Sequence, residues 1–152
     1  MTFVTGAIIG AVAGLIMAIL IAVSKTQKNN NIVKTISPAP DYAALYHYAS
    51  PKRFKNSLKF FDSYGTLYVI GNKAYYKAGT NATPVEFDLA TTTITAEPDW
   101  RRLKWFSLTN AAGEKYYFDS HKMGFITNDS SETLKGLAFL QEKQRKITGS
   151  VF

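Results

Sequence analysis

The chain has no cysteine among its 152 residues and only two histidines, His47 and His121. Without cysteine, disulfide bonds and thiolate metal sites are excluded, and the redox state of the compartment is left open. The two histidines are far apart in the sequence and neither lies in a metal-binding motif, so zinc chemistry is short of ligands. The sequence therefore predicts no metal site and no cofactor.

Catalytic motifs are absent as well. There is no Gly-rich phosphate loop and no serine nucleophile elbow. The acidic residues of the middle region have no defined pair geometry, and salt bridges with arginines are their simpler interpretation; they are Glu86, Asp88, Glu97 and Asp99. Either histidine would need a nearby carboxylate and a pocket to act as a base, and packed or surface histidines are the simpler reading. We expect no enzyme; the remaining enzymatic alternative is a hydrolase or transferase whose site the sequence does not reveal.

The N-terminus contains one long apolar run. From Gly6 to Val23 no side chain is charged or strongly polar, and Phe3 to Thr5 extend the run. About twenty helical residues cross a hydrocarbon core of roughly 30 Å, and in lipid the segment must be helical. Ala22-Val23-Ser24 also has the pattern of a signal-peptide cleavage site, but no Lys or Arg precedes the run. We therefore predict a single transmembrane helix at residues 1–24.

Basic residues lie on one side of this helix only. Lys25, Lys28 and Lys34 follow it and none precedes it, so the positive-inside rule places the N-terminus outside the plasma (inner) membrane and the remaining chain in the cytoplasm. The net charge of +7 and the pI near 9.5 suit an anionic membrane surface or nucleic acid, or serve solubility alone. With an anchor present, we expect a membrane partner and no nucleic acid.

Small residues recur every four positions within the apolar run. Such a stripe lets two helices approach closely in lipid, although a segment rich in Gly and Ala also produces this spacing by composition. The predicted helix–helix interface, with a second copy or another membrane subunit, consists of Gly6, Gly10, Gly14, Ala18 and Ala22.

Residues 25–40 are polar and read as a linker, and residues 41–152 as one soluble domain. Asp41 is expected to cap a short helix in which Tyr42, Leu45, Tyr46 and Ala49 share a face. Runs rich in aromatic and β-branched residues then predict seven antiparallel strands. Their expected ranges are Leu58–Asp62, Thr66–Gly71, Lys73–Lys77, Val85–Leu89, Thr91–Thr95, Arg102–Thr109 and Lys115–Asp119.

The chain ends in a predicted amphipathic helix. Asp129 and Glu132 have the spacing of a capping box at its start. Its expected apolar face consists of Leu134, Leu137, Ala138 and Leu140. The fold class predicted is therefore α+β, mainly β: an N-terminal transmembrane helix, an antiparallel barrel or sheet of about seven strands, and a C-terminal helix that caps it.

This order of elements resembles the pleckstrin-homology (PH)-like superfold, and in particular bacterial PH or GRAM-type domains. The resemblance covers residues 58–146 and rests on the segments Gly65–Tyr76, Thr83–Leu89 and Asn110–Phe118. It implies a partly open barrel that binds lipids, peptides or other subunits. The loop Ser63-Tyr64-Gly65 lacks the basic signature associated with phosphoinositide recognition.

Two basic aromatic segments are the candidate binding sites. The first could lie against anionic headgroups, or could be the solvated face of a strand; it contains Lys52, Arg53, Lys55 and Lys59, interleaved with Phe54, Leu58, Phe60 and Phe61. The second could bind phosphate or an acidic strip of a protein partner, or could reflect core packing of Trp105 beside a charged turn; it contains Trp100, Arg101, Arg102 and Lys104.

These observations predict a membrane-anchored PH-like interaction module that serves as a subunit of a larger membrane assembly or as a homo-oligomer, with anionic lipid as a possible ligand. The alternative is a sensor or transport component that binds a lipid or a small apolar ligand. A pocket inside the sheet would favour the alternative, and a flat basic aromatic patch the interaction module.

Overall fold

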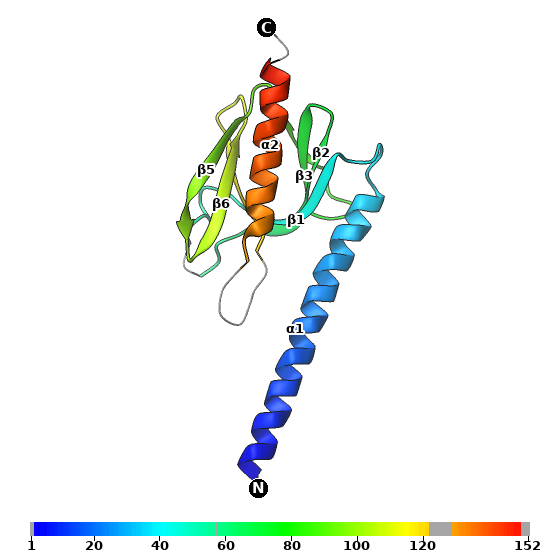
Figure 1. Cartoon of the computed structure of the whole chain (residues 1–152), viewed down its shortest axis with the longest axis vertical. Coiled ribbons are helices and arrows are strands. Elements are labelled where there is room, and N and C mark those ends of the chain that lie inside the picture. The colour runs from blue at the N-terminus through cyan, green and yellow to red at the C-terminus, as the bar shows by residue number, and fades with distance from the viewer. Residues whose placement is uncertain (1, 57, 122–128, 150–152) are drawn as a thin grey trace.

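The structure, a computed structural model, describes residues 2–56, 58–121 and 129–149 (Figure 1). It consists of helix α1 (Thr2–Lys34), a sheet of seven antiparallel strands and helix α2 (Ser131–Gly149). The predicted fold class is confirmed: the chain is mainly β, with an apolar N-terminal helix and a C-terminal helix that covers the sheet.

Helix α1 is longer than the predicted anchor. It continues without a break to Lys34, so residues 25–34 are helical and not the linker that the sequence predicted. The reason is tertiary packing: Ile32 is fully buried, and the Asn29 side chain accepts a hydrogen bond of 2.8 Å from the Thr66 hydroxyl. Packing of one face outweighs the weak helix propensity of an Asn-rich segment.

The seven strands are arranged around β1. Their order in the sheet is β4-β3-β2-β1-β7-β6-β5, and every pairing is antiparallel. Their bounds are Tyr42–Ala49 (β1), Ser63–Ile70 (β2), Lys73–Lys77 (β3), Val85–Asp88 (β4), Thr93–Trp100 (β5), Leu103–Thr109 (β6) and Lys115–Asp119 (β7). Six predicted strands overlap β2 to β7. The predicted turn at Gly71-Asn72 connects β2 to β3, and the one at residues 110–113 connects β6 to β7.

Two of the predicted elements are wrong. Tyr42–Ala49 is strand β1 and not a short helix, and residues 58–62 contain no strand. In β1, alternate side chains such as Tyr42, Tyr46 and Tyr48 contribute to the core. Tyr42 and Tyr46 also fit a helical spacing of three or four together with Leu45 and Ala49, and a segment of eight residues is too short for periodicity to separate helix from strand.

The main core lies between the sheet and α2, which crosses one face of it (Figure 1). Helix α2 buries Thr133, Gly136 and Leu140, whereas the predicted apolar-face residue Leu134 is half exposed. The fully buried aromatic and aliphatic core side chains include Tyr46, Leu67, Val69, Phe87, Leu89, Phe106, Leu108 and Phe118.

Buried tyrosine hydroxyls fix the N-terminal turn of α2 to β1. The Tyr42 hydroxyl donates to the Glu132 carboxylate at 2.7 Å, and the Tyr46 hydroxyl donates to the Glu132 carbonyl at 2.8 Å. Burial raises the pKa of both phenols, so they stay protonated donors at any physiological pH. Gly136 allows this approach because a Cβ atom there would collide with the Tyr46 hydroxyl.

We therefore expect Gly136→Ala to lower the free energy of unfolding by about 1–3 kcal/mol, the usual cost of overpacking. Urea unfolding of the full chain in detergent, followed by circular dichroism, measures it. Gly149→Ala on the same helix is the matched control, because a Cβ there meets nothing within 4 Å. In a Tyr46→Phe background the cost should shrink; an equal cost in both backgrounds would contradict the collision.

Candidate functional site

Residues 50–56 and 58–62 form an irregular layer on the outer face of the sheet, over β1, β6 and β7. Their aromatic side chains join a second apolar cluster built on Ala49, Leu103 and Trp105. Phe54 stacks on Tyr117 with ring centroids 3.9 Å apart. The alternation that predicted a first strand here reflects anchoring aromatic residues interleaved with exposed basic ones.

The exposed side of this layer is basic with one apolar projection. Lys52, Lys55 and Lys59 are exposed, whereas Arg53 is 3.5 Å from Asp62 in an ion pair. Leu58 is 95% exposed, the highest value among the large hydrophobic side chains that the structure describes. The Asn56 side chain accepts hydrogen bonds from the backbone N–H groups of residues 58 and 59, at 3.0 and 3.2 Å.

The turn between β5 and β6 carries two exposed arginines, Arg101 and Arg102, the second of which the sequence placed in a strand. Trp100 pairs with Leu103 across the turn, and the central residues Arg101 and Arg102 have φ values of 53° and 61°. This left-handed conformation normally selects Asn and Gly in two-residue hairpins. For other residues it costs about 1–2 kcal/mol each. The turn therefore keeps two arginines where they are conformationally unfavourable.

The two predicted clusters meet in one surface. The Phe60 and Trp100 rings lie 5.4 Å apart, and the Arg101 guanidinium lies 4.6 Å from the Trp100 ring centroid and 5.7 Å from that of Phe60. We call residues 52–59 together with Trp100, Arg101 and Arg102 the basic aromatic surface. Trp105 is buried beneath it, so core packing explains that residue.

Charge is concentrated at this surface. Residues 50–62 and 99–104 contain seven basic and two acidic side chains, which accounts for five of the chain's seven net positive charges. Asp62 pairs with Arg53, and Asp99 pairs with Lys104 at 2.6 Å. In Figure 1 the β5–β6 turn lies at the end of the domain towards which the N-terminal half of α1 extends.

The other candidate acids form no carboxylate pair. Glu86 binds Lys73 at 2.6 Å and Glu97 binds Lys115 at 2.8 Å, so the described ion pairs are with lysines rather than with the predicted arginines. Asp88 stabilises the turn after β4, where its side chain accepts a hydrogen bond from the Ala90 N–H at 3.0 Å.

The fold brings the two histidines together, which the sequence analysis did not anticipate. His47 on β1 pairs directly with Asp119 on β7, and His121 follows two residues later. The His121 Nδ1 atom is 2.8 Å from Asp119 Oδ2 and the His47 Nδ1 atom 3.4 Å from it; the two imidazole rings stack with centroids 5.0 Å apart. We call these three residues the His-Asp-His cluster.

This cluster is buried. Asp119 is fully buried and the His47 and His121 side chains are 9% and 10% exposed, with the Phe61 ring 4.8 Å from that of His47. Burial alone would raise the pKa of the Asp119 carboxyl, but the hydrogen bond with His121 and the adjacent His47 ring outweigh it and hold that pKa below its usual value. The cluster therefore contains a buried carboxylate anion between two imidazoles.

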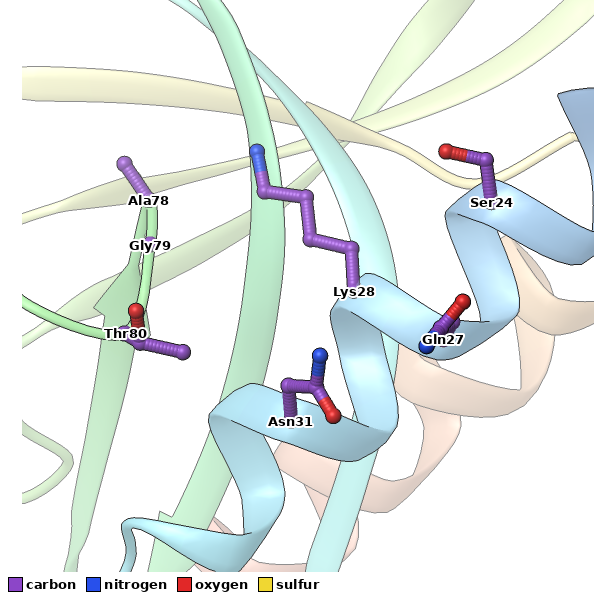
Figure 2. A pocket seen from close by; sticks show the side chains of 7 residues that line it. All are labelled: Ser24, Gln27, Lys28, Asn31, Ala78, Gly79 and Thr80. Atoms are coloured by element: carbon purple, nitrogen blue, oxygen red, sulfur yellow. The ribbon is translucent and has the colours of Figure 1, made fainter.

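A shallow groove lies outside the sheet, between α1 and the residues that follow β3 (Figure 2). It is lined by Ser24, Gln27, Lys28, Asn31, Ala78, Gly79 and Thr80. Polar side chains of α1 dominate one wall, and Lys28 extends from it to donate a hydrogen bond of 2.8 Å to the Tyr64 carbonyl. The interior of the sheet, where an apolar ligand was the alternative, is filled with core side chains.

Comparison of the chain with protein-family models finds no match, and comparison with curated proteins finds none either. The resemblance to PH or GRAM-type domains therefore remains a prediction. Three features of the described residues bear on the function: the basic aromatic surface, the His-Asp-His cluster and the apolar helix.

Glu97, on the edge strand β5, makes the stability of the fold depend on pH. Burial opposes its ionisation, but hydrogen bonds from Lys115 and Ser107 outweigh that effect and lower its pKa below 4.5. A lowered folded-state pKa stabilises the fold above the unfolded pKa, and this contribution disappears as the pH falls through the folded value.

The stability difference between wild type and Glu97→Gln should therefore be constant near neutral pH and shrink below about pH 4.5. Urea unfolding across pH measures it, with the exposed Glu86→Gln as control; a difference that grows in acid would contradict the assignment.

Proposed function

We propose that this chain is a single-pass membrane protein whose PH-like domain binds the anionic leaflet beside its own anchor, and so positions itself within a membrane assembly. Helix α1 is long and apolar enough to cross a membrane, and the apolar window within its candidate span, Gly10–Lys34, is not buried by the domain. A signal sequence passes the same test of length and composition. The unbroken continuation of α1 into contacts with β2 supports an anchor.

The charge distribution supports a cytoplasmic domain in the plasma (inner) membrane. Lys25, Lys28 and Lys34 follow the apolar segment, which the positive-inside rule assigns to the cytoplasm. The basic aromatic surface belongs to the same side of the membrane. Cytoplasmic leaflets are the ones that carry a negative surface potential, so both features favour one orientation.

The strand order supports the PH-like part of the proposal. Strands β1 to β4 are successive neighbours, β5 to β7 are successive neighbours, and β1 joins β7 between the two groups. Helix α2 then covers one face (Figure 1). This arrangement suits a domain that binds through its loops and outer surface, since its interior is packed.

The observation that carries the proposal is Leu58 in its setting. Leu58 is almost fully exposed, lies between Lys55 and Lys59 in the sequence, and belongs to the layer whose Phe60 ring contacts Trp100 and Arg101, so this surface combines an exposed apolar side chain with positive charge. Each basic residue near an anionic surface contributes about 1 kcal/mol. Burying a leucine side chain adds about 1.5–3 kcal/mol. Because the anchor holds the surface at high local concentration, contacts of this size suffice.

The apolar helix supplies a second contact surface for the proposed assembly. Cβ atoms placed on Gly10 and Gly14 would meet nothing within 4 Å, so this stripe is open in a single chain. We propose that it packs against a helix of a second copy or of another subunit.

Replacing Gly10 and Gly14 with Leu should weaken this association by about 1 kcal/mol or more, because close backbone approach is lost while the segment stays apolar. Energy transfer between labelled chains in liposomes measures it. Val12→Leu, between the two glycines, is the control. Equal association of all three chains would remove the interface.

Membrane contact of Leu58 can be measured in the full chain, because the absence of cysteine makes Leu58→Cys a unique labelling site. With an environment-sensitive dye at this position, liposomes that contain phosphatidylserine should give a blue-shifted, brighter emission than phosphatidylcholine alone. High salt should reverse part of the change, since it screens exposed charges. Leu134→Cys on α2, another exposed leucine, is the control and should not respond.

The charge requirement has its own matched pair of variants. A triple variant with Lys52, Lys55 and Lys59 changed to Gln should bind anionic lipid at least tenfold more weakly, because each charge contributes about 1 kcal/mol. The dye at position 58 reports this affinity. Lys135, Arg145 and Lys146 on α2 changed to Gln remove the same charge elsewhere and should leave it intact. Equal responses of the two triple variants would contradict the proposal.

The β5–β6 turn predicts opposite effects on stability and binding. Arg101→Asn with Arg102→Gly places the favoured residues at the two left-handed positions, so the free energy of unfolding should rise by about 1–2 kcal/mol. The same change removes two cations and the two cation–π contacts of Arg101 with Phe60 and Trp100, so the response to anionic lipid should fall. Urea unfolding and the Leu58→Cys assay measure the two effects. A more stable variant that binds anionic lipid fully would show that these arginines are not part of the surface.

A further inference from the structure

The His-Asp-His cluster, which the proposed function does not use, has the composition and geometry of a metal site. His47 Nδ1 and one oxygen of Asp119, Oδ1, are buried and have no hydrogen-bond partner among the described residues. Buried polar atoms are nearly always paired, so the unpaired Asp119 Oδ1, and His47 Nδ1 with only a long contact of 3.4 Å to Asp119 Oδ2, need an explanation. We propose that His47, Asp119 and His121 bind a divalent transition-metal ion of the zinc class.

The donor atoms are close enough to share one ion. One ligand atom from each residue falls within a group no wider than 4.8 Å. Tetrahedral zinc with bonds near 2.0–2.1 Å separates its ligand atoms by about 3.3 Å. The 3.4 Å between His47 Nδ1 and Asp119 Oδ2 matches this spacing. The 2.8 Å between His121 Nδ1 and Asp119 Oδ2 is a hydrogen bond that an ion would replace after a small shift of the ring.

The chemistry of the donors selects the ion. Two imidazoles and one carboxylate suit zinc and other late first-row divalent ions, whereas magnesium and calcium prefer oxygen ligands only. Three protein ligands leave a fourth position for water. The apolar ring of Phe61 beside His47 lowers the local dielectric constant, which strengthens the attraction between the ion and Asp119.

The backbone on either side of the cluster is held in place. Ser120 lies between Asp119 and His121. Its hydroxyl donates a hydrogen bond of 2.6 Å to the Leu45 carbonyl. Its N–H and carbonyl both bind the Thr133 hydroxyl at 2.8 Å. The positions of Asp119 and His121 are therefore fixed relative to β1 and α2, as ligands of a metal site must be.

The location gives the ion a structural role. Strand β1 pairs with β2 through seven residue pairs but with β7 through only three, and the cluster lies at the end of this short seam. An ion bound to one residue of β1 and to two at the end of β7 would join the two halves of the sheet. Metal binding to the folded state alone raises stability by mass action.

The experiment uses the untagged full chain in detergent, freed of metal by a chelator and titrated with zinc chloride in a calorimeter. We expect one ion per chain with a dissociation constant of about 1 μM or lower, and a rise in melting temperature on binding. Asp119→Asn and His121→Gln should each weaken binding at least tenfold. Asp99→Asn, an exposed carboxylate, is the control and should leave it unchanged.

A second measurement does not depend on how the variants fold. Zinc-edge X-ray absorption of the loaded wild-type chain should show two imidazole ligands among nitrogen and oxygen donors. A chain that binds no zinc at about 100 μM, or that binds it with fewer than two imidazoles, would overturn the proposal. So would variants that fold and bind zinc as wild type does.

Discussion

The contact between the last turns of α1 and the sheet is the interaction on which the rest of the structure depends. Ile32 is fully buried there, Asn29 bonds to Thr66, and Lys28 bonds to the Tyr64 carbonyl. Because the same helix contains the apolar segment, the domain is fixed to the anchor rather than tethered by a flexible chain. The basic aromatic surface thereby keeps one orientation relative to the apolar segment, which lowers the entropic cost of a weak surface contact.

The outer face of the sheet is covered in two parts, and both candidate sites result from this arrangement. Helix α1 covers the part near β2, and residues 50–62 cover the part over β1, β6 and β7. The aromatic rings of that layer anchor it and leave its lysines and Leu58 exposed. Beneath Phe61, at the short seam between β1 and β7, the same cover encloses His47, Asp119 and His121. A surface suited to lipid and a buried site suited to metal are thus neighbours for structural reasons.

Most of the architecture was predictable because its signals are local. The apolar run, the alternation in β2 to β7 and the turns at Gly71 and Gly113 each depend on neighbouring residues. The helix at residues 25–34 was not predicted, because it is stabilised by the burial of Ile32 against residues that are distant in sequence. A charged turn before β6 was predicted. Its proximity to residues 52–59 was not, because it depends on ring contacts between segments that are distant in sequence. The His-Asp-His cluster was missed because Tyr42–Ala49 was interpreted as a helix, so His47 had no cross-strand partner. The available signal was the spacing of two between Asp119, the last residue of β7, and His121.

The central claim is that the anchor holds the basic aromatic surface against the bilayer, and Trp100 tests it directly. The chain has two tryptophans, and Trp105→Phe leaves Trp100 as the only one. In liposomes of anionic lipid with brominated acyl chains, where bromine quenches only nearby indole rings, the account predicts strong quenching of Trp100 when the bromine is close to the headgroup and weaker quenching when it is near the bilayer centre. Emission that is unaffected by bromine at either depth would contradict the account.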